Sequence, residues 1–175
     1  MGRIWRVLLL LTCAGCGSHH SAETADGSQA APLDCAPFAR ALSGIQLSGA
    51  AADWWAQATG RYERTARPVV GGVLVLRRSG RLPDGHVAVV SQVMGQRTIL
   101  VTQANWVHHR VAQDQPVIDV SAANDWTVVR VWWPPAGDMG VTEYAAFGFI
   151  RGDRAATHQQ IAAAVPRAIR LAEQQ

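Results

Sequence analysis

The feature that most constrains the fold is a change of hydrophobic pattern after the Arg-Pro pair at residues 67–68. From there on, apolar residues alternate as they do in β-strands, which predicts strands at residues 72–77, 86–93, 98–105, 117–120 and 126–132. The first three are joined by short segments that contain the turn-forming pairs Ser-Gly, Asp-Gly and Gly-Gln. Because such short connections join antiparallel neighbours, this part of the chain predicts an antiparallel sheet.

Helical patterns lie on both sides of these strands. Asp34 is a good N-cap residue, and apolar residues at helical spacing predict a helix over residues 35–43. A second short helix is expected at residues 48–58, and a C-terminal helix at residues 155–173, which Pro166 should kink or split. We therefore expect an α+β fold in which short N-terminal helices pack on a small antiparallel sheet, with a helix at the C-terminus.

Composition narrows the classes of function. The 175 residues are 49% hydrophobic and 17% charged, which fits one globular domain with a core. The formal charge of +3 falls by two, to +1, when Arg3 and Arg6 are removed with the leader, so charge gives no support for nucleic-acid binding. No cysteine or carboxylate cluster has zinc spacing, and the adjacent His108 and His109 would face opposite sides of a strand. We expect no metal, no cofactor and, by default, a monomer.

The N-terminus predicts export. Arg3 and Arg6 precede the apolar residues 7–11, followed by small residues, as in a secretory signal, and this apolar stretch is too short to span a bilayer. Residues 13–16, Cys-Ala-Gly-Cys, resemble the lipobox of bacterial lipoproteins. That resemblance implies cleavage before Cys16, a lipid on its sulfur and anchoring to a membrane. The alternative is an ordinary signal, cut elsewhere, that yields a soluble secreted protein. We expect export to the periplasm or cell envelope, with a lipid anchor in a membrane.

Cys35 is the thiol that remains if Cys13 leaves with the signal and Cys16 is lipidated. It then has no partner for an internal disulfide in a compartment where disulfides persist, which favours a reactive role. The alternative is a buried cysteine that serves as a small apolar residue. Its position at a predicted helix N-terminus favours the thiolate, so we expect an acidified thiol, although the charge of Asp34 opposes this shift.

A histidine and two carboxamides lie downstream on neighbouring predicted strands. If Gly95-Gln96 forms the centre of the turn, His86 faces Asn105; if Met94-Gly95 does, His86 faces Gln103. Either register leaves the other carboxamide within reach on the diagonal, and Asn105 is slightly favoured as the group that orients the imidazole. The order of cysteine, histidine and carboxamide is typical of cysteine hydrolases, with a thiolate nucleophile, a base and an orienting group.

Several segments together resemble the CHAP family of cysteine, histidine-dependent amidohydrolases/peptidases: Asp34-Cys35 with Phe38-Ala39-Arg40, residues 68–76, Gly85-His86-Val87-Ala88-Val89-Val90 and Ala104-Asn105-Trp106. The likeness covers roughly residues 32–133. It implies a papain-like α+β fold and cleavage of amide bonds in bacterial peptidoglycan. It also implies that Cys35 is the nucleophile, His86 the base and the strand ending at residues 103–106 the source of the third group. Many members carry glutamine where this chain has Asp34, and a carboxylate where it has Gln103.

These observations divide the chain into a signal peptide with a lipobox-like end at residues 1–16, a flexible tether at 17–32, a catalytic domain at 33–150 and a helical segment at 151–175. The leading hypothesis is an exported hydrolase of peptidoglycan amides, with Trp106 as a candidate lining of the substrate groove. A second hypothesis is a binding module that grips wall peptides without turnover. A third is an acyl transferase that uses the same residues on an acceptor other than water.

Overall fold

The computed structural model describes residues 33–175. The expected signal, the lipid site at Cys16 and the tether at residues 17–32 lie outside these residues. The elements follow in the order α1 (Cys35–Ser43), η1 (Ala51–Asp53), α2 (Trp54–Gln57), β1 (Glu63–Thr65), β2 (Val73–Leu76), β3 (His86–Val93), β4 (Thr98–Ala104), β5 (Val111–Asp119), β6 (Val128–Trp133), β7 (Asp138–Met139), β8 (Tyr144–Arg151) and α3 (His158–Ala172).

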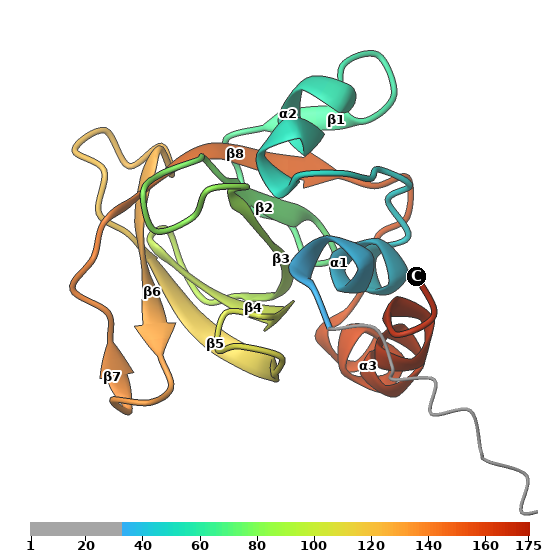
Figure 1. Cartoon of the computed structure of the whole chain (residues 1–175). Coiled ribbons are helices and arrows are strands. Elements are labelled where there is room, and N and C mark those ends of the chain that lie inside the picture. Colours follow the sequence, from blue (N-terminus) through green and yellow to red (C-terminus); the bar gives the residue numbers. More distant parts are fainter. Residues whose placement is uncertain (1–32) are drawn as a thin grey trace, which may run out of the picture.

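The strands form one antiparallel sheet in the order β1-β8-β2-β3-β4-β5-β6-β7 (Figure 1). Strand β8 also pairs with β6, so the sheet from β2 to β6 closes on itself in a barrel-like arrangement. The expected α+β class and antiparallel pairing are confirmed. The sheet is larger than the small sheet that the sequence predicts, and its closure was not part of that prediction.

Helices α1 and α3 lie side by side on one flank of the sheet, where α1 packs against β3 and β4 (Figure 1). Alternation along β3 gives this strand two different faces. Val87 and Val89 belong to the core shared with both helices, whereas Ala88 and Val90 belong to the core inside the barrel. Strand β3 is therefore the wall between the two cores, and His86 stands at its first position.

Several predicted elements need correction. The second helix is a 3-10 turn followed by a single α-helical turn, and β5 begins earlier than expected, at Val111. Strand β8 was not predicted. Pro166 does not split α3, whose N-terminus is fixed by a capping box between Thr157 and Gln160 and whose buried side chains lie on both sides of the proline. Among residues 33–175, no helix has the length and apolar character needed to cross a bilayer.

Candidate active site

Cys35 is the first residue of α1 and is partly buried. Backbone N–H groups of Val87, Ala36 and Cys35 itself lie near enough to its thiol to lower the pKa of Cys35. The N–H groups of Ala36 and Cys35 belong to the first turn of α1, where no helical carbonyl is available to accept them. Because Val87 directly follows His86 in β3, these contacts place the sulfur beside the start of the strand that carries the histidine.

The acidity of this thiol differs from the expectation. Burial is the largest effect and raises the pKa of Cys35. The backbone N–H groups lower the pKa, while the negative charge of Asp34 raises it further. The net direction is upward, so the expected acidified thiol is corrected: in the resting site Cys35 is a neutral thiol at neutral pH.

His86 is buried and is held by one hydrogen bond. Its side chain is buried, at 4% exposure, and its Nε2 atom lies 2.9 Å from Oε1 of Gln103, which is itself 1% exposed. Because a carboxamide oxygen only accepts hydrogen bonds, Nε2 carries the proton and Nδ1 holds the basic lone pair. Burial lowers the pKa of His86 to about 4, although the hydrogen bond to Gln103 opposes this shift. The imidazole is therefore a neutral base at neutral pH.

Gly85 explains why the histidine begins the strand where it does. Its φ of +74° is a left-handed conformation that side chains rarely adopt. A Cβ atom here would lie 2.6 Å from the carbonyl oxygen of Leu76 and 2.7 Å from the Cβ of Ala52. The chain thus passes close to β2 and η1 immediately before His86, and glycine is the residue that permits this approach.

The register of β3 and β4 decides between the two carboxamides. Val89 pairs with Thr102 and Val90 with Val101, as expected for a turn centred on Gly95-Gln96, but a bulge near Ser91 shifts the pairing next to the turn. This register would put Asn105 opposite His86. However, β4 ends at Ala104, and Asn105 adopts a φ of +60°, outside the ladder.

Asn105 instead contacts the residue before the cysteine. Its Nδ2 atom donates to Oδ1 of Asp34 at 2.8 Å, and its Oδ1 atom accepts from the backbone N–H of His109 at 2.9 Å. The preference for Asn105 as the partner of the imidazole is therefore corrected in favour of Gln103. Asp34 is the N-cap residue of α1, as predicted, but its side chain makes no capping hydrogen bond.

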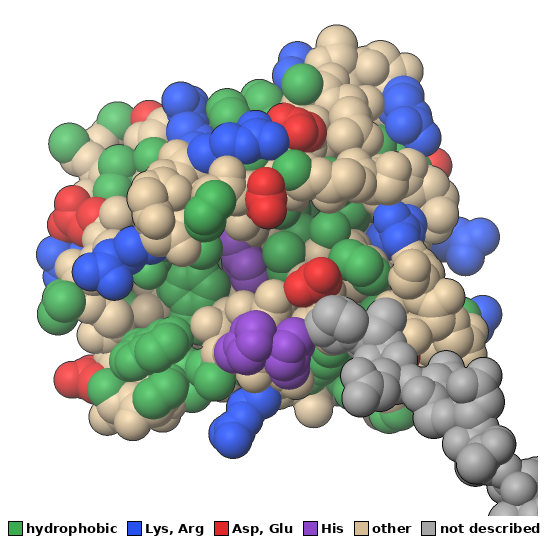
Figure 2. Space-filling view, viewed as in Figure 1, with side chains coloured by type: hydrophobic (Ala, Val, Ile, Leu, Met, Phe, Trp, Pro, Cys, Tyr) green, Lys and Arg blue, Asp and Glu red, His purple; other side chains and the backbone are tan. Residues whose placement is uncertain are grey.

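An aromatic wall adjoins His86. The ring of Trp106 meets the imidazole edge to face at a centroid distance of 5.0 Å, and Tyr144 meets Trp106 in the same way at 5.2 Å. The indole Nε1 of Trp106 donates to the carbonyl oxygen of Trp132 at 3.1 Å. Apolar and histidine side chains gather around a hollow on the face shown in Figure 2. The sequence identified Trp106 but missed Tyr144, because β8 was not predicted.

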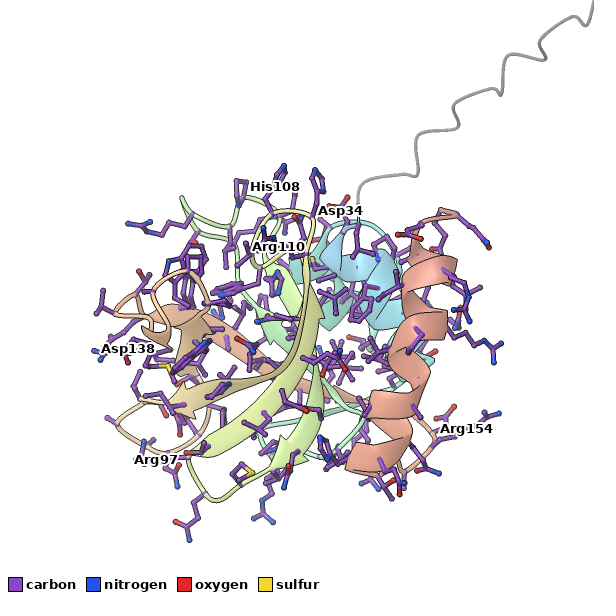
Figure 3. The ribbon with its side chains drawn as sticks, turned by 90° about the horizontal axis from the view of Figure 1, so that it is seen from below. Asp34, Arg97, His108, Arg110, Asp138 and Arg154 are labelled. Carbon is purple, nitrogen blue, oxygen red and sulfur yellow. The ribbon has the colours of Figure 1, made fainter. Side chains whose placement is uncertain are left out.

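The loop after Asn105 lies at the same end of the molecule as Asp34. Figure 3 shows Asp34, His108 and Arg110 together, away from Arg97, Asp138 and Arg154. His108 and His109 lie exposed in a turn and not on a strand, with ring centroids 3.7 Å apart. Within residues 33–175, no group of three or more histidine, cysteine or acidic side chains is arranged to hold a metal ion.

The site places the thiol of Cys35 at the start of α1 and an imidazole, oriented by the carboxamide of Gln103, at the start of the neighbouring strand β3. The thiol and the imidazole are both neutral at rest, so charge separates between them only when the sulfur attacks an electrophile. Such a site is suited to acyl transfer from an amide or ester through a thioester.

Comparison with known proteins gives one finding for this region. The family model of the CHAP domain matches residues 25–105, a span that contains Cys35, His86, Gln103 and Asn105. No curated protein matches the chain.

Proposed function

Because residues 25–105 belong to the CHAP domain family, whose members are generally amidases and peptidases of the cell wall, we propose that this protein is a cysteine amidohydrolase or endopeptidase that hydrolyses peptidoglycan. The observation that carries the proposal lies at the start of β3. Cys35 packs against the core that contains Val87, and Gln103 forms a hydrogen bond with Nε2 of the adjacent His86. Nδ1 is thereby left to serve as the base.

Acylation follows from these positions. The sulfur of Cys35 forms a bond to the carbonyl carbon of the amide while its proton passes to Nδ1 of His86, and the carbonyl electron pair moves to oxygen. When the tetrahedral adduct collapses, the carbon–nitrogen bond breaks and the imidazolium returns the proton to the leaving amine. The products of this half-reaction are a free amine and a thioester on Cys35.

Deacylation uses the same base. His86 removes a proton from water, the water oxygen bonds to the thioester carbon, and the thiolate leaves and regains the proton from the imidazolium. The second product is a carboxylate. Because Gln103 is neutral, it orients the ring but stabilises the imidazolium less than a carboxylate would, which is consistent with the lowered pKa of His86.

The aromatic wall supports a sugar–peptide polymer as the substrate. Trp106 is partly buried, and its ring is fixed by His86, Tyr144 and the carbonyl of Trp132. Aromatic faces suit the apolar faces of sugar rings and peptide stems. We assign the exposed part of Trp106 to substrate binding, within a papain-like arrangement of α1 against the sheet.

The location of the protein is part of the same proposal. The leader resembles that of a lipoprotein, and export to the periplasm or cell envelope would bring the enzyme to its substrate. A lipid on Cys16 would hold it at a membrane surface, with residues 17–32 as a tether between anchor and domain.

Digestion of isolated cell wall tests the proposal. Purified mature protein is incubated with peptidoglycan, and newly formed amino and carboxyl groups are quantified, with fragment masses giving the bond cleaved. We expect release by the wild type and none by Cys35→Ala. An unchanged wall in the presence of folded wild-type protein would refute hydrolysis. Fragments that carry an added amine in place of water would identify an acyl transferase.

The raised pKa of Cys35 favours one second candidate, a module that binds wall peptides without cleaving them. Co-sedimentation with insoluble peptidoglycan separates the two functions. A binding module would sediment with the wall and leave its covalent bonds intact, and Cys35→Ala would bind as well as the wild type.

A further inference from the structure

The carboxamide of Asn105 forms hydrogen bonds through both its oxygen and its nitrogen. Its oxygen accepts from the backbone N–H of His109 at 2.9 Å, and its nitrogen donates to Oδ1 of Asp34 at 2.8 Å. The backbone N–H of Asn105 also donates to the carbonyl oxygen of Arg110 at 2.9 Å, which fixes the loop that carries His109. Both the backbone and the carboxamide group of Asn105 are therefore restrained by hydrogen bonds.

The two partners dictate which way the amide points. Rotation by 180° about its last bond would set the amide oxygen against the carboxylate of Asp34 and the amide nitrogen against the N–H of His109. Both contacts would then be repulsive. The nitrogen thus faces the residue that precedes Cys35. One of its two N–H bonds is used by Asp34, and the other has no acceptor among the hydrogen bonds of residues 33–175.

We propose that Asp34 is a positioning residue, whose carboxylate holds Asn105 so that the second N–H of this amide donates to the oxyanion formed when Cys35 attacks a carbonyl. This inference rests on the proposed acyl-transfer chemistry and extends it to the group that stabilises the negative oxygen. The backbone N–H of Cys35, at the start of α1, is the natural second donor.

The identity of residue 34 leaves the place of a side-chain donor open. As an anion, Asp34 accepts hydrogen bonds and cannot donate one to an oxyanion, unlike the glutamine that many CHAP domains carry here. Its charge also raises the pKa of Cys35, and within residues 33–175 it forms no ion pair that would neutralise this effect. The hydrogen bond to Asn105 is the side-chain contact of this carboxylate among residues 33–175, and it holds a neutral donor against the residue that precedes Cys35.

A reversible aldehyde inhibitor tests the donor directly. Acetyl-Ala-alaninal adds to a cysteine thiol and places an oxygen where the oxyanion forms, so its affinity reports the donors whether or not the cell wall is the substrate. The first variant is Asn105→Gly, because glycine adopts a φ of +60° without strain. We expect its aldehyde affinity and its kcat on cell wall to fall by about 10²-fold, the usual effect of losing one oxyanion donor, with little change in KM.

Two variants of Asp34 separate position from charge. Asp34→Asn keeps an oxygen that accepts from Asn105, whereas Asp34→Ala does not. Both remove the negative charge, so both should lower the pKa of Cys35 and accelerate alkylation by iodoacetamide to the same extent. Only Asp34→Ala should lose aldehyde affinity, at least tenfold relative to Asp34→Asn. If Asp34 only supported the local structure, the alkylation rate and the aldehyde affinity would change in parallel in the two variants.

A rescue experiment completes the test. Glutamine at residue 34 can itself donate a hydrogen bond to the oxyanion. The double variant Asp34→Gln, Asn105→Gly is therefore expected to bind the aldehyde at least tenfold more tightly than Asn105→Gly alone. Wild-type affinity in Asn105→Gly, equal affinity in Asp34→Asn and Asp34→Ala, or no aldehyde binding by the wild type would each overturn the proposal. Aldehyde binding that follows the prediction, together with an unchanged cell wall, would overturn only the choice of substrate.

Discussion

His86 and Gln103 form a buried hydrogen bond in which Nε2 lies 2.9 Å from Oε1, and this contact sets the protonation state of the site. It assigns the proton to Nε2 and the base to Nδ1. Since the partner is an amide and not a carboxylate, little offsets the effect of burial, and the pKa of His86 falls to about 4. The raised pKa of Cys35 leaves a neutral pair, where many cysteine hydrolases hold a thiolate and an imidazolium.

Replacement of Gln103 by glutamate should convert the neutral pair toward an ion pair. In Gln103→Glu a carboxylate next to Nε2 raises the pKa of His86, and the imidazolium in turn lowers the pKa of Cys35. Such neighbours shift a pKa by about 1 to 3 units. The pH at which iodoacetamide alkylation reaches half its maximum rate should fall by at least about one unit. The control is Gln113→Glu on β5, where the side chain is exposed; an identical shift in both variants would contradict the account.

The wild-type thiol should react slowly at neutral pH. Burial and the charge of Asp34 raise the pKa of Cys35, so thiolate forms mainly above the ordinary value of 9.0. The rate of alkylation, measured by mass spectrometry from pH 5 to 11, is expected to climb with pH throughout the neutral range. Cys35→Ala controls for labelling elsewhere. A rate that has already levelled off below pH 7 would indicate a preformed thiolate.

Acid should destabilise the fold through His86. The unfolded histidine takes up a proton near pH 6.5, whereas the folded one does so only near pH 4. The free energy of unfolding therefore has its full value above pH 6.5, where His86 is neutral in both states, and it decreases as the pH falls toward 4. The loss is about 3 kcal/mol at most. Urea unfolding between pH 4 and 7 should show a smaller pH dependence in His86→Asn than in the wild type.

The exposed His108 provides the control for this measurement, because His108→Asn removes an imidazole that folding does not bury. Its unfolding free energy should follow the wild-type curve across the same pH range. Equal pH dependence in the wild type and in His86→Asn would show that the buried histidine does not carry the effect.

Gly85 should be intolerant of a side chain. In Gly85→Ala the new Cβ would meet the carbonyl oxygen of Leu76 at 2.6 Å in a left-handed backbone conformation. Strain of this kind costs about 1 to 3 kcal/mol and would displace the start of β3, so both stability and wall hydrolysis should fall. Gly80→Ala is the matched control, because no atom lies within 4 Å of the corresponding Cβ. Equal melting temperatures for the two variants would contradict the prediction.

Part of the fold could be predicted because it follows local rules. The bounds of α1 follow from a good N-cap residue, helical spacing and Gly44 in the left-handed conformation, and the alternating residues of β3 match residues 86–93. Strand β8 could not be predicted in this way. Its two alanines and Gly148 are poor strand formers and interrupt the pattern of the strand-forming Tyr144, Phe147, Phe149 and Ile150, and its place in the sheet depends on pairing with β1, β2 and β6.

The site, like the fold, contains features that the sequence pattern predicts and features that it does not. The alternation of β3 and β4 is sufficient to bring a carboxamide to His86, and the diagonal partner, Gln103, was among the two expected. The left-handed turn at Asn105 was not foreseen, and it transfers that side chain from His86 to Asp34. The acidity of Cys35 could not be predicted from its helical position, because burial depends on the packing of α1 against β3 and outweighs the effect of the N–H groups.

Cys35 should form a thioester with the wall peptide during turnover, and trapping this intermediate is the decisive experiment. Wild-type protein is mixed with purified peptidoglycan fragments and quenched in acid during turnover, and the peptide that contains Cys35 is weighed by mass spectrometry. We predict an added mass equal to the acyl half of the cleaved substrate, absent from Cys35→Ala, which should also release no amine. Hydrolysis by Cys35→Ala at the wild-type rate would contradict the account.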